Sequence, residues 1–395
     1  MTMPKILMLC DFFSDELDFQ ENLLSKYYRK LGCEVVIVTS TYTSVFDFYE
    51  DRYEPSIRSE FVDQYGSRVI RVPFGFNIKQ KLKTFTGFYD ILNSFEPDVL
   101  FFHSIHLDMI TSIKFLKNNR PRVIVDYHMD KQNSANSFLS RVVLHSIIRN
   151  LIRRIFLKYI DVEYAVAPSV IDFMGKRYAI QPECLPLLPL GSDVDLIDTL
   201  SKSNCRNRII EQYGLDQECF VMVTGGKLNN LKRTHIAIRA AHKVCEMDNS
   251  FSINLLVVGE GDSKDSDYLE SLKHLASIGN ANIIFCGWQG KKDLYSHLLA
   301  SDVAVFPRSQ SILWQHAIAS RLPLIVGTAV DESVDYLNGG DNMIIVNDTD
   351  DEQVFAQHIL KLVQDEELRR SMGAGSKAVT KEMLDWNTLI RKVLK

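Results

Sequence analysis

The stretch FVMVTGGKL at residues 220–228 decides the fold of the second half of the chain. A short apolar run that ends in glycines and leads into a helical pattern is typical of a buried parallel strand that turns into a helix. The same alternation of short apolar runs and longer amphipathic stretches recurs along the whole chain. It predicts parallel sheets that are covered by helices on both faces.

The apolar runs fall into two series, and prolines and a glycine interrupt the chain between them, near residues 186–205. Helical patterns such as 21–31, 83–95 and 108–118 separate the strands of the first series. We predict an α/β chain of two doubly wound Rossmann-like domains that face each other across a cleft at their strand ends. The expected strands are 6–9, 35–39, 69–72, 99–102, 123–125 and 164–167, and then 220–224, 254–258, 282–285, 303–306, 323–326 and 343–346.

Composition and charge exclude several classes of protein. The 395 residues carry a formal net charge of -5, which argues against a protein devoted to nucleic acid. Seven scattered cysteines without a CxxC pair predict reduced thiols in a cytosol and no zinc site. The first apolar run is too short for a signal peptide, and no window reaches the roughly 18 apolar residues of a membrane span. We therefore expect a cytoplasmic protein.

The turn after residues 220–224 brings glycines and cations together: Gly225, Gly226, Lys227 and Lys232. Glycine lets a backbone approach a phosphate, and two lysines could neutralise a diphosphate leaving group. The alternative is an ordinary strand-to-helix turn with solvated lysines.

Two later strands also end in features that suit a nucleotide. Residues 255–262 form a strand that ends in Gly259-x-Gly261, an incomplete dinucleotide fingerprint. Residues 283–289 deliver Trp288 to a loop, where its ring could border a nucleotide or pack as a rim residue.

In this order the segments resemble the retaining glycosyltransferases of family 4, which have the GT-B fold. Residues 225–232 resemble the family's Gly-Arg-Leu…Lys-Gly segment, whose two cations hold the donor diphosphate. Residues 257–261 and 285–288 resemble its Val-x-Gly-x-Gly strand and its Phe-x-Gly-aromatic turn, and 300–307 and 316–323 its next two motifs. The resemblance covers almost the whole chain. It implies transfer of a sugar, with retention, from a nucleotide diphosphate, most often UDP, to a hydroxyl acceptor.

The chain departs from the family in residues 307–316. The two glutamates that family members usually carry eight positions apart are missing, and His316 stands where the second belongs. The neutral side chains there can still hydrogen-bond sugar or ribose hydroxyls. Four of these neutral residues are donor-binding candidates: Ser309, Gln310, Ser311 and Gln315. The other donor-binding candidates are His316, Gly225, Gly226, Gly259 and Trp288.

The resemblance also singles out a histidine in the first half of the chain. His128 follows the strand 123–125, as does the family histidine that lies beside the reacting sugar. An imidazole titrates near neutral pH and can hydrogen-bond a sugar, so we place His128 at the catalytic centre with Lys227 and Lys232. The family's usual Gly-Gly after the first strand is absent. We expect the acceptor to contact Gln20, His103 and Asp130.

Three Asp-x-Asp triplets, at 193–195, 265–267 and 348–350, could in principle hold a divalent metal ion. None of them follows a strand in a nucleotide pocket of this plan. We interpret all three as turns or helix caps and expect no metal and no cofactor other than the nucleotide sugar.

Residues 140–160 contain no acidic residue and alternate basic with apolar side chains. A basic amphipathic helix of this kind can lie on an anionic membrane surface, which would make the protein peripheral and its acceptor lipid-linked. The alternative is a core-facing helix with a solvated basic side.

We expect an acceptor-binding domain over 1–195, completed by a C-terminal helix at 382–395, and a donor-binding domain over 196–381. The expected function is retaining transfer to a lipid-linked glycan in bacterial surface polysaccharide synthesis, as in O-antigen or capsule. One alternative is a sugar-nucleotide epimerase, which needs acid and base carboxylates around the donor sugar. The other is a non-catalytic protein that binds a sugar nucleotide or glycan.

Overall fold

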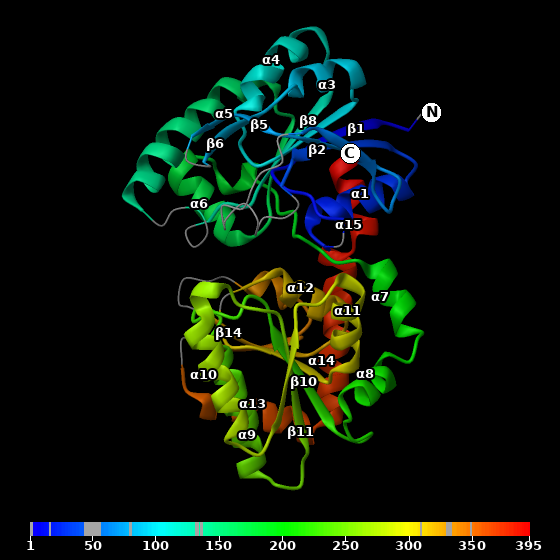
Figure 1. Cartoon of the computed structure of the whole chain (residues 1–395), viewed down its shortest axis with the longest axis vertical. Coiled ribbons are helices and arrows are strands. Elements are labelled where there is room, and N and C mark those ends of the chain that lie inside the picture. Colours follow the sequence, from blue (N-terminus) through cyan, green and yellow to red (C-terminus); the bar gives the residue numbers. More distant parts are fainter. Residues whose placement is uncertain are drawn as a thin grey trace. The chain divides into compact units, whose positions relative to one another are not determined.

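The computed structural model describes residues 3–15, 17–42, 57–78, 81–130, 134, 137–308, 310–328, 334–347 and 350–395. Contacts divide the chain between Pro189 and Leu190 into two compact units, called the first and second domains below. Each is a sheet covered by helices (Figure 1). Within the described residues, no helix is both long and apolar enough to span a bilayer.

The first domain contains a seven-stranded sheet with the order β3-β4-β2-β1-β7-β8-β9. All its strand pairs are parallel except β3 with β4. The strands are β1 (Lys5–Leu9), β2 (Glu34–Ser40), β3 (Ser59–Val62), β4 (Arg68–Val72), β7 (Val99–His103), β8 (Arg122–Tyr127) and β9 (Val162–Ala165). The helices are α1 (Gln20–Lys30), α3 (Phe88–Phe95), α4 (Asp108–Asn118), the π-helix η1 (Ser140–Arg149), α5 (Asn150–Phe156) and α6 (Pro168–Tyr178).

The second domain contains a six-stranded parallel sheet with the order β12-β11-β10-β13-β14-β15. Its strands are β10 (Phe220–Gly225), β11 (Ile253–Val258), β12 (Asn282–Gly287), β13 (Val303–Phe306), β14 (Leu324–Thr328) and β15 (Met343–Asn347). Its helices are α7 (Val194–Ser201), α8 (Cys205–Tyr213), α9 (Thr234–Met247), α10 (Ser266–Ser277), α11 (Lys291–Ala300), α12 (Ile312–Ala319), α13 (Glu352–Gln364), α14 (Glu366–Val379) and α15 (Trp386–Leu394).

The strand β10 shows why apolar runs without alternation become central strands. Val221 and Val223 pack into the core cluster that contains Trp314 of α12. Met222 points to the opposite face and packs with Ile236 of α9. A strand covered by helices on both faces buries every side chain, so the doubly wound architecture predicted from the sequence is confirmed.

Most of the predicted elements are confirmed, but the helix predicted over 83–95 is wrong in its first part. Leu82–Phe85 is the strand β6, which pairs with β5 (Phe74–Ile78) in an antiparallel hairpin. The helix α3 begins only after Gly87, whose backbone has φ of 72°. The hairpin and β3 had no counterpart in the predicted pattern, and β9 lies two residues before the strand predicted at 164–167.

The division into domains falls within the segment 186–205, where prolines and a glycine interrupt the chain. Residues of α15 up to Val393 are counted with the second domain. The expectation that 382–395 completes the acceptor domain stays a prediction, as do the boundaries 1–195 and 196–381.

Neighbouring strand ends in the second domain approach so closely that two positions admit no side chain. A Cβ atom on Gly225 would lie 1.9 Å from the carbonyl oxygen of Val258, and one on Gly259 would lie 2.0 Å from that of Gly226. Gly259 also has φ of +128°, a conformation that side-chain-bearing residues rarely adopt. These glycines are therefore required by the contact between β10 and β11.

We predict that Gly259→Ala lowers the free energy of unfolding of the second domain by about 3 kcal/mol, because it adds both a steric clash and backbone strain. Gly290→Ala is the matched control, since a Cβ there meets nothing within 4 Å. Urea unfolding followed by circular dichroism measures both changes. Equal stability of the two variants would contradict the assigned role of Gly259.

Candidate functional site

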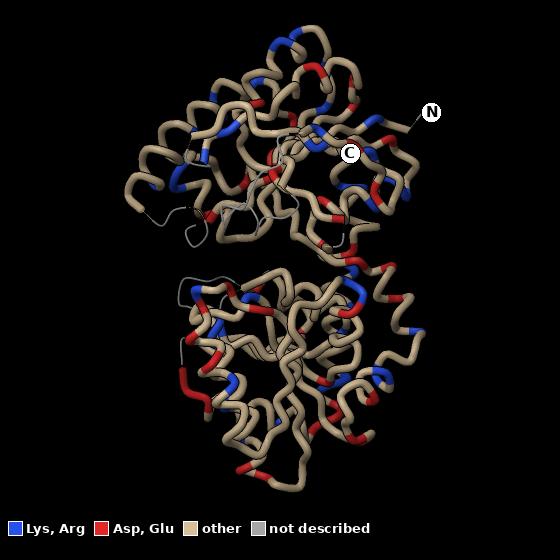
Figure 2. Tube along the Cα trace, viewed as in Figure 1, with Lys and Arg blue, Asp and Glu red and all other residues tan. Residues whose placement is uncertain are grey.

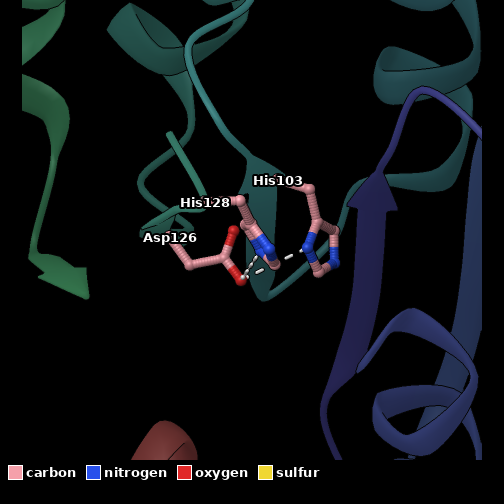
Figure 3. A group of neighbouring side chains, drawn as sticks. All are labelled: His103, Asp126 and His128. Atoms are coloured by element: carbon pink, nitrogen blue, oxygen red, sulfur yellow. Dashed lines mark hydrogen bonds and ion pairs between the residues drawn. The ribbon is translucent and has the colours of Figure 1, made fainter. Parts of the chain in front are cut away.

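Three polar side chains meet at the carboxyl edge of the first sheet. The strands β7 and β8 pair in parallel with His103 opposite Asp126, and His128 follows β8 two residues after Asp126. Figure 3 shows both imidazoles beside the Asp126 carboxylate. The strand register therefore assembles this group from residues that lie far apart in the sequence.

Both histidines direct a ring nitrogen at the same carboxylate oxygen. His128 Nε2 lies 3.1 Å and His103 Nδ1 3.3 Å from Asp126 Oδ2. Asp126 is fully buried and the side chain of His103 is 8% exposed, whereas that of His128 is 35% exposed. His128 is thus the member of the group that a ligand reaches most easily.

Charge links the pKa of Asp126 to that of His128. Burial acts to raise the pKa of Asp126, but the charges and hydrogen bonds of His103 and His128 outweigh it and lower the pKa well below its usual value. Burial acts to lower the pKa of His128, but Asp126 and Glu21 outweigh it and raise the pKa. The buried carboxylate therefore stays ionised and favours an imidazolium at His128.

The same group is also a possible metal site. One ligand atom from each of His103, Asp126 and His128 lies within 4.8 Å of the other two. Two imidazoles and a carboxylate suit zinc and other transition metals. The hydrogen bond from His128 accounts for the arrangement without an ion, so our expectation of no metal stays a prediction.

Gln20, which the sequence predicts as an acceptor contact, and its neighbour Glu21 lie in the first turn of α1 in the first domain. Gln20 is 2% exposed, and neither polar atom of its side-chain amide has a hydrogen-bond partner among the described residues. Burial raises the pKa of Glu21, while the charges of His103 and His128 oppose that shift. Asp130 lies two residues beyond His128 and is half-buried. Acceptor binding by Gln20, His103 and Asp130 stays a prediction.

At the carboxyl edge of the second sheet, hydrogen bonds fix the turn after β10. The N–H of Gly226 donates to Val258 O at 2.9 Å, and the N–H of Leu228 donates to Glu260 O at 2.9 Å. These bonds join the ends of β10 and β11. The glycines thus allow the two strand ends to approach each other. This structural role is independent of phosphate binding.

The turn holds its two predicted cations in defined places. Lys227 Nζ forms an ion pair with Asp262, and its side chain is 38% exposed. Lys232 Nζ donates to the carbonyl oxygen of Gln310 at 3.2 Å. The hydrogen bond from Lys227, more than any other contact, lowers the pKa of Asp262. Both ammonium groups therefore lie at the sheet edge where ligands of open parallel sheets bind.

Trp288 lies at the end of β12, and 47% of its surface is exposed. Its backbone N–H donates to Glu260 Oε1 at 3.2 Å. The indole is therefore accessible to a ligand, as the sequence suggested, although stacking on a nucleotide stays a prediction.

The structure gives Gln315 and His316 contacts within the second domain. The N–H of Gly191 donates to Gln315 Oε1 at 2.8 Å, and His316 Nδ1 lies 2.9 Å from Ser192 Oγ. Both side chains are buried, and burial lowers the pKa of His316 to about 3. His316 is therefore neutral and anchors the segment 190–193 within the second domain. Direct donor contacts by this pair stay a prediction.

The other candidates of this segment lie at the start of α12. The side chain of Gln310 donates to the hydroxyl of Tyr336, and its carbonyl accepts from Lys232. The carbonyl of Ser311 accepts from the N–H of Trp314 in the first turn of the helix. Ser309 lies outside the described residues.

Two of the three acidic triplets take part in helix caps, and the third is described only at Asp350, which pairs with Arg233. Asp193 caps α7 by accepting from the N–H of Leu196. Asp265 takes part in a capping box with Asp262 before α10. Asp348 and Thr349 lie outside the described residues.

Family models match both halves of the chain. The model for Glycosyltransferase Family 4 matches residues 23–196, and the model for Glycosyl transferases group 1 matches residues 219–365. The chain is a glycosyltransferase of the family 4 and group 1 type. The resemblance drawn from the sequence motifs is thereby confirmed, and so is the expectation of an enzyme.

Relatives and solved structures agree with this assignment. An uncharacterized glycosyltransferase of Methanocaldococcus jannaschii is 24% identical over 255 residues, which are 62% of this chain and 60% of that protein. A glycosyltransferase of Rickettsia africae has a TM-score of 0.68 at 14% identity and covers 100% of this chain and 97% of its own. HepE of Anabaena, in complex with UDP and glucose, has a TM-score of 0.66 at 14% identity, with coverage of 99% and 98%. These likenesses show the GT-B fold.

The sequence analysis did not assign Asp126 and Glu21 to the site. The signal for Asp126 is its position two residues before His128 at a strand end, because side chains two apart on a strand point to the same face. Glu21 carries no such signal, since only the fold brings α1 near the two histidines.

We predict that Asp126→Asn lowers the pKa of His128 by at least about one unit, because it removes the opposite charge that favours the imidazolium. A raised pKa contributes stability at low pH that is lost as the pH rises through the folded value. The variant should therefore lose more stability at pH 5 than at pH 8.

The pKa is measured by NMR titration of the imidazole signals, with His128→Gln for assignment. Asp172→Asn, an exposed position on α6, is the control. An unchanged His128 pKa in Asp126→Asn would show that the ion pair does not govern this titration.

Proposed function

We propose that the chain transfers a sugar from a UDP-sugar to a hydroxyl of a lipid-linked glycan, with retention at the anomeric carbon. The observation that carries this proposal is the pair of lysines, Lys227 and Lys232, at the carboxyl edge of the second sheet. It is supported by the family models and by HepE, a protein of the same fold whose structures contain UDP and UDP-glucose.

Leaving-group electrostatics supply the main catalytic effect in this proposal. As the bond between the anomeric carbon and the phosphate oxygen breaks, negative charge develops on the diphosphate. Ammonium groups at the edge of the sheet stabilise that charge. Asp262 already pairs with Lys227, so the bound diphosphate would share that cation with the carboxylate.

Retention needs no carboxylate nucleophile if the acceptor attacks on the face that the leaving group vacates. A bond forms between the acceptor oxygen and the anomeric carbon, and the acceptor proton passes to the departing diphosphate oxygen. His128, whose pKa is raised by its contact with Asp126, would donate a hydrogen bond to the donor sugar. Asp126 acts as a positioning residue in this scheme.

The acceptor side lies in the first domain, with Gln20, His103 and Asp130 as its candidates. A buried amide such as that of Gln20, which has no hydrogen-bond partner in the described part of the chain, is a suitable group to hydrogen-bond a sugar hydroxyl. WaaG, a glycosyltransferase involved in lipopolysaccharide biosynthesis, is similar in fold, with a TM-score of 0.63 at 15% identity over 98% of both chains. We propose bacterial surface polysaccharide synthesis at the cytoplasmic face of a membrane as the setting.

We predict that Lys232→Ala lowers the rate of UDP release from the preferred UDP-sugar by about 10²–10³-fold, because it removes a group that stabilises the transition state. Lys227→Ala should lower the rate less, since Asp262 already offsets its charge. A panel of UDP-sugars, with and without glycan acceptors, identifies the donor by UDP release.

Lys273→Ala, an exposed lysine of α10, is the control and should keep the parent rate. A Lys232→Ala rate within twofold of the parent would remove this residue from the mechanism. NMR of the product tests retention, and an inverted anomeric configuration would contradict that part of the proposal.

A further inference from the structure

An apolar row runs along the outer face of the helical segment η1–α5. Its members lie four residues apart, which places them on one face of a helix. Their exposed fractions range from 38% to 69%, whereas the outer face of an ordinary surface helix is polar. The row consists of Leu139, Val143, Ile147, Leu151 and Ile155.

The opposite face of the segment already packs against the first domain. His145 is fully buried, and its Nδ1 lies 2.8 Å from the hydroxyl of Tyr178. Arg153 is buried in an ion pair with Glu163, and Phe156 is fully buried. These contacts agree with the alternative of a core-facing helix, but its solvent-facing side carries the apolar row as well as basic side chains. A large exposed apolar patch marks a surface for a partner.

The charge around the row indicates which partner it fits. Figure 2 shows lysine and arginine but no acidic residue along 140–160, in a chain whose net charge is -5. At the end of the segment, Lys158 lines a cavity of about 510 Å³ together with Lys117, Arg120 and Arg122. Arg122 Nη1 is buried there without a hydrogen-bond partner among the described residues. The acidic residue of the lining, Asp161, accepts a hydrogen bond from the N–H of Val123 at 2.7 Å.

We propose that the apolar row docks the first domain on an anionic lipid bilayer, with the adjoining basic cavity facing phosphate headgroups. Apolar side chains flanked by cations are the composition that binds such an interface. A second copy of the chain fits less well, because a symmetric interface would bring the same cations of both copies together. The docking proposal rests on the proposed function at one point: the purpose of docking is access to a lipid-linked acceptor.

The test is co-sedimentation of the full chain with vesicles of phosphatidylglycerol and phosphatidylcholine, compared with phosphatidylcholine alone. The parent should bind the anionic vesicles at least about tenfold more tightly than the neutral ones. The double variant Ile147→Ser, Leu151→Ser should bind the anionic vesicles at least about tenfold more weakly than the parent. Ile278→Ser, an equally exposed apolar position in the second domain, should bind as the parent does.

A second variant tests the charges of the cavity. Arg120→Gln with Lys158→Gln should reduce the preference for anionic vesicles, and inorganic phosphate at the ionic strength of a chloride control should leave vesicle binding unchanged. Displacement from vesicles by phosphate, beyond the effect of chloride, would assign the cavity to a soluble phosphate and overturn its role toward headgroups.

Two results would overturn the docking proposal itself. One is a parent that does not bind anionic vesicles, and the other is a row variant that binds as well as the parent. A dimer seen by light scattering and lost in the row variant would assign the row to a second copy. The rate of donor hydrolysis in solution should be the same in the row variant as in the parent. An unchanged rate also shows that the row variant folds. Vesicle binding without any turnover of UDP-sugars would refute the proposed function and leave the docking surface intact.

Discussion

Contact between neighbouring backbones at the carboxyl edge of the second sheet is the constraint on which the turn after β10 depends. The Cβ that Gly225 lacks would fall 1.9 Å from Val258 O, well inside any permitted contact. The N–H of Gly226 donates to Val258 O and that of Leu228 donates to Glu260 O, so hydrogen bonds join the ends of β10 and β11 and fix the turn. The turn is followed by Lys227, which pairs with Asp262, and by Lys232, which donates to the carbonyl oxygen of Gln310.

A second constraint is electrostatic and belongs to the first domain. Asp126 is a fully buried carboxylate, which would be unstable without compensation, and His103 and His128 supply it. The compensation works in both directions, because the carboxylate raises the pKa of His128. The fold thus leaves His128 partly exposed, with a pKa that Asp126 and Glu21 raise against the effect of burial.

The sequence was sufficient to predict the strands that are buried on both faces. Runs such as 220–224 and 254–258 have no polar interruption, so their period and length identify central strands. It was insufficient for 82–85, where alternation over four residues is too short to separate a hairpin strand from the start of a helix. The sequence predicted Gly225 and Gly259 as donor-binding residues, which stays a prediction, whereas the structure assigns them a steric reason that spacing alone cannot reveal.

Contacts between residues that are distant in the chain explain the rest of what the sequence could not show. His316 was recognised as the substitute for a glutamate, yet its partner Ser192 lies 124 residues away. Asp126 was visible beside His128, but its contact with His103 depends on the pairing of β7 with β8. The exposed apolar row was visible only as a basic amphipathic stretch, because its outward direction depends on what η1 and α5 pack against.

The most direct test of the central claim is an experimental structure of the chain with bound UDP. We predict that the diphosphate lies at the carboxyl edge of the second sheet, with its oxygens within hydrogen-bond distance of Lys232 Nζ, and that Lys227 shares its ammonium group between Asp262 and a phosphate. UDP bound elsewhere, or bound at this edge with both lysines directed away from the diphosphate, would rule out the proposed role of the lysines.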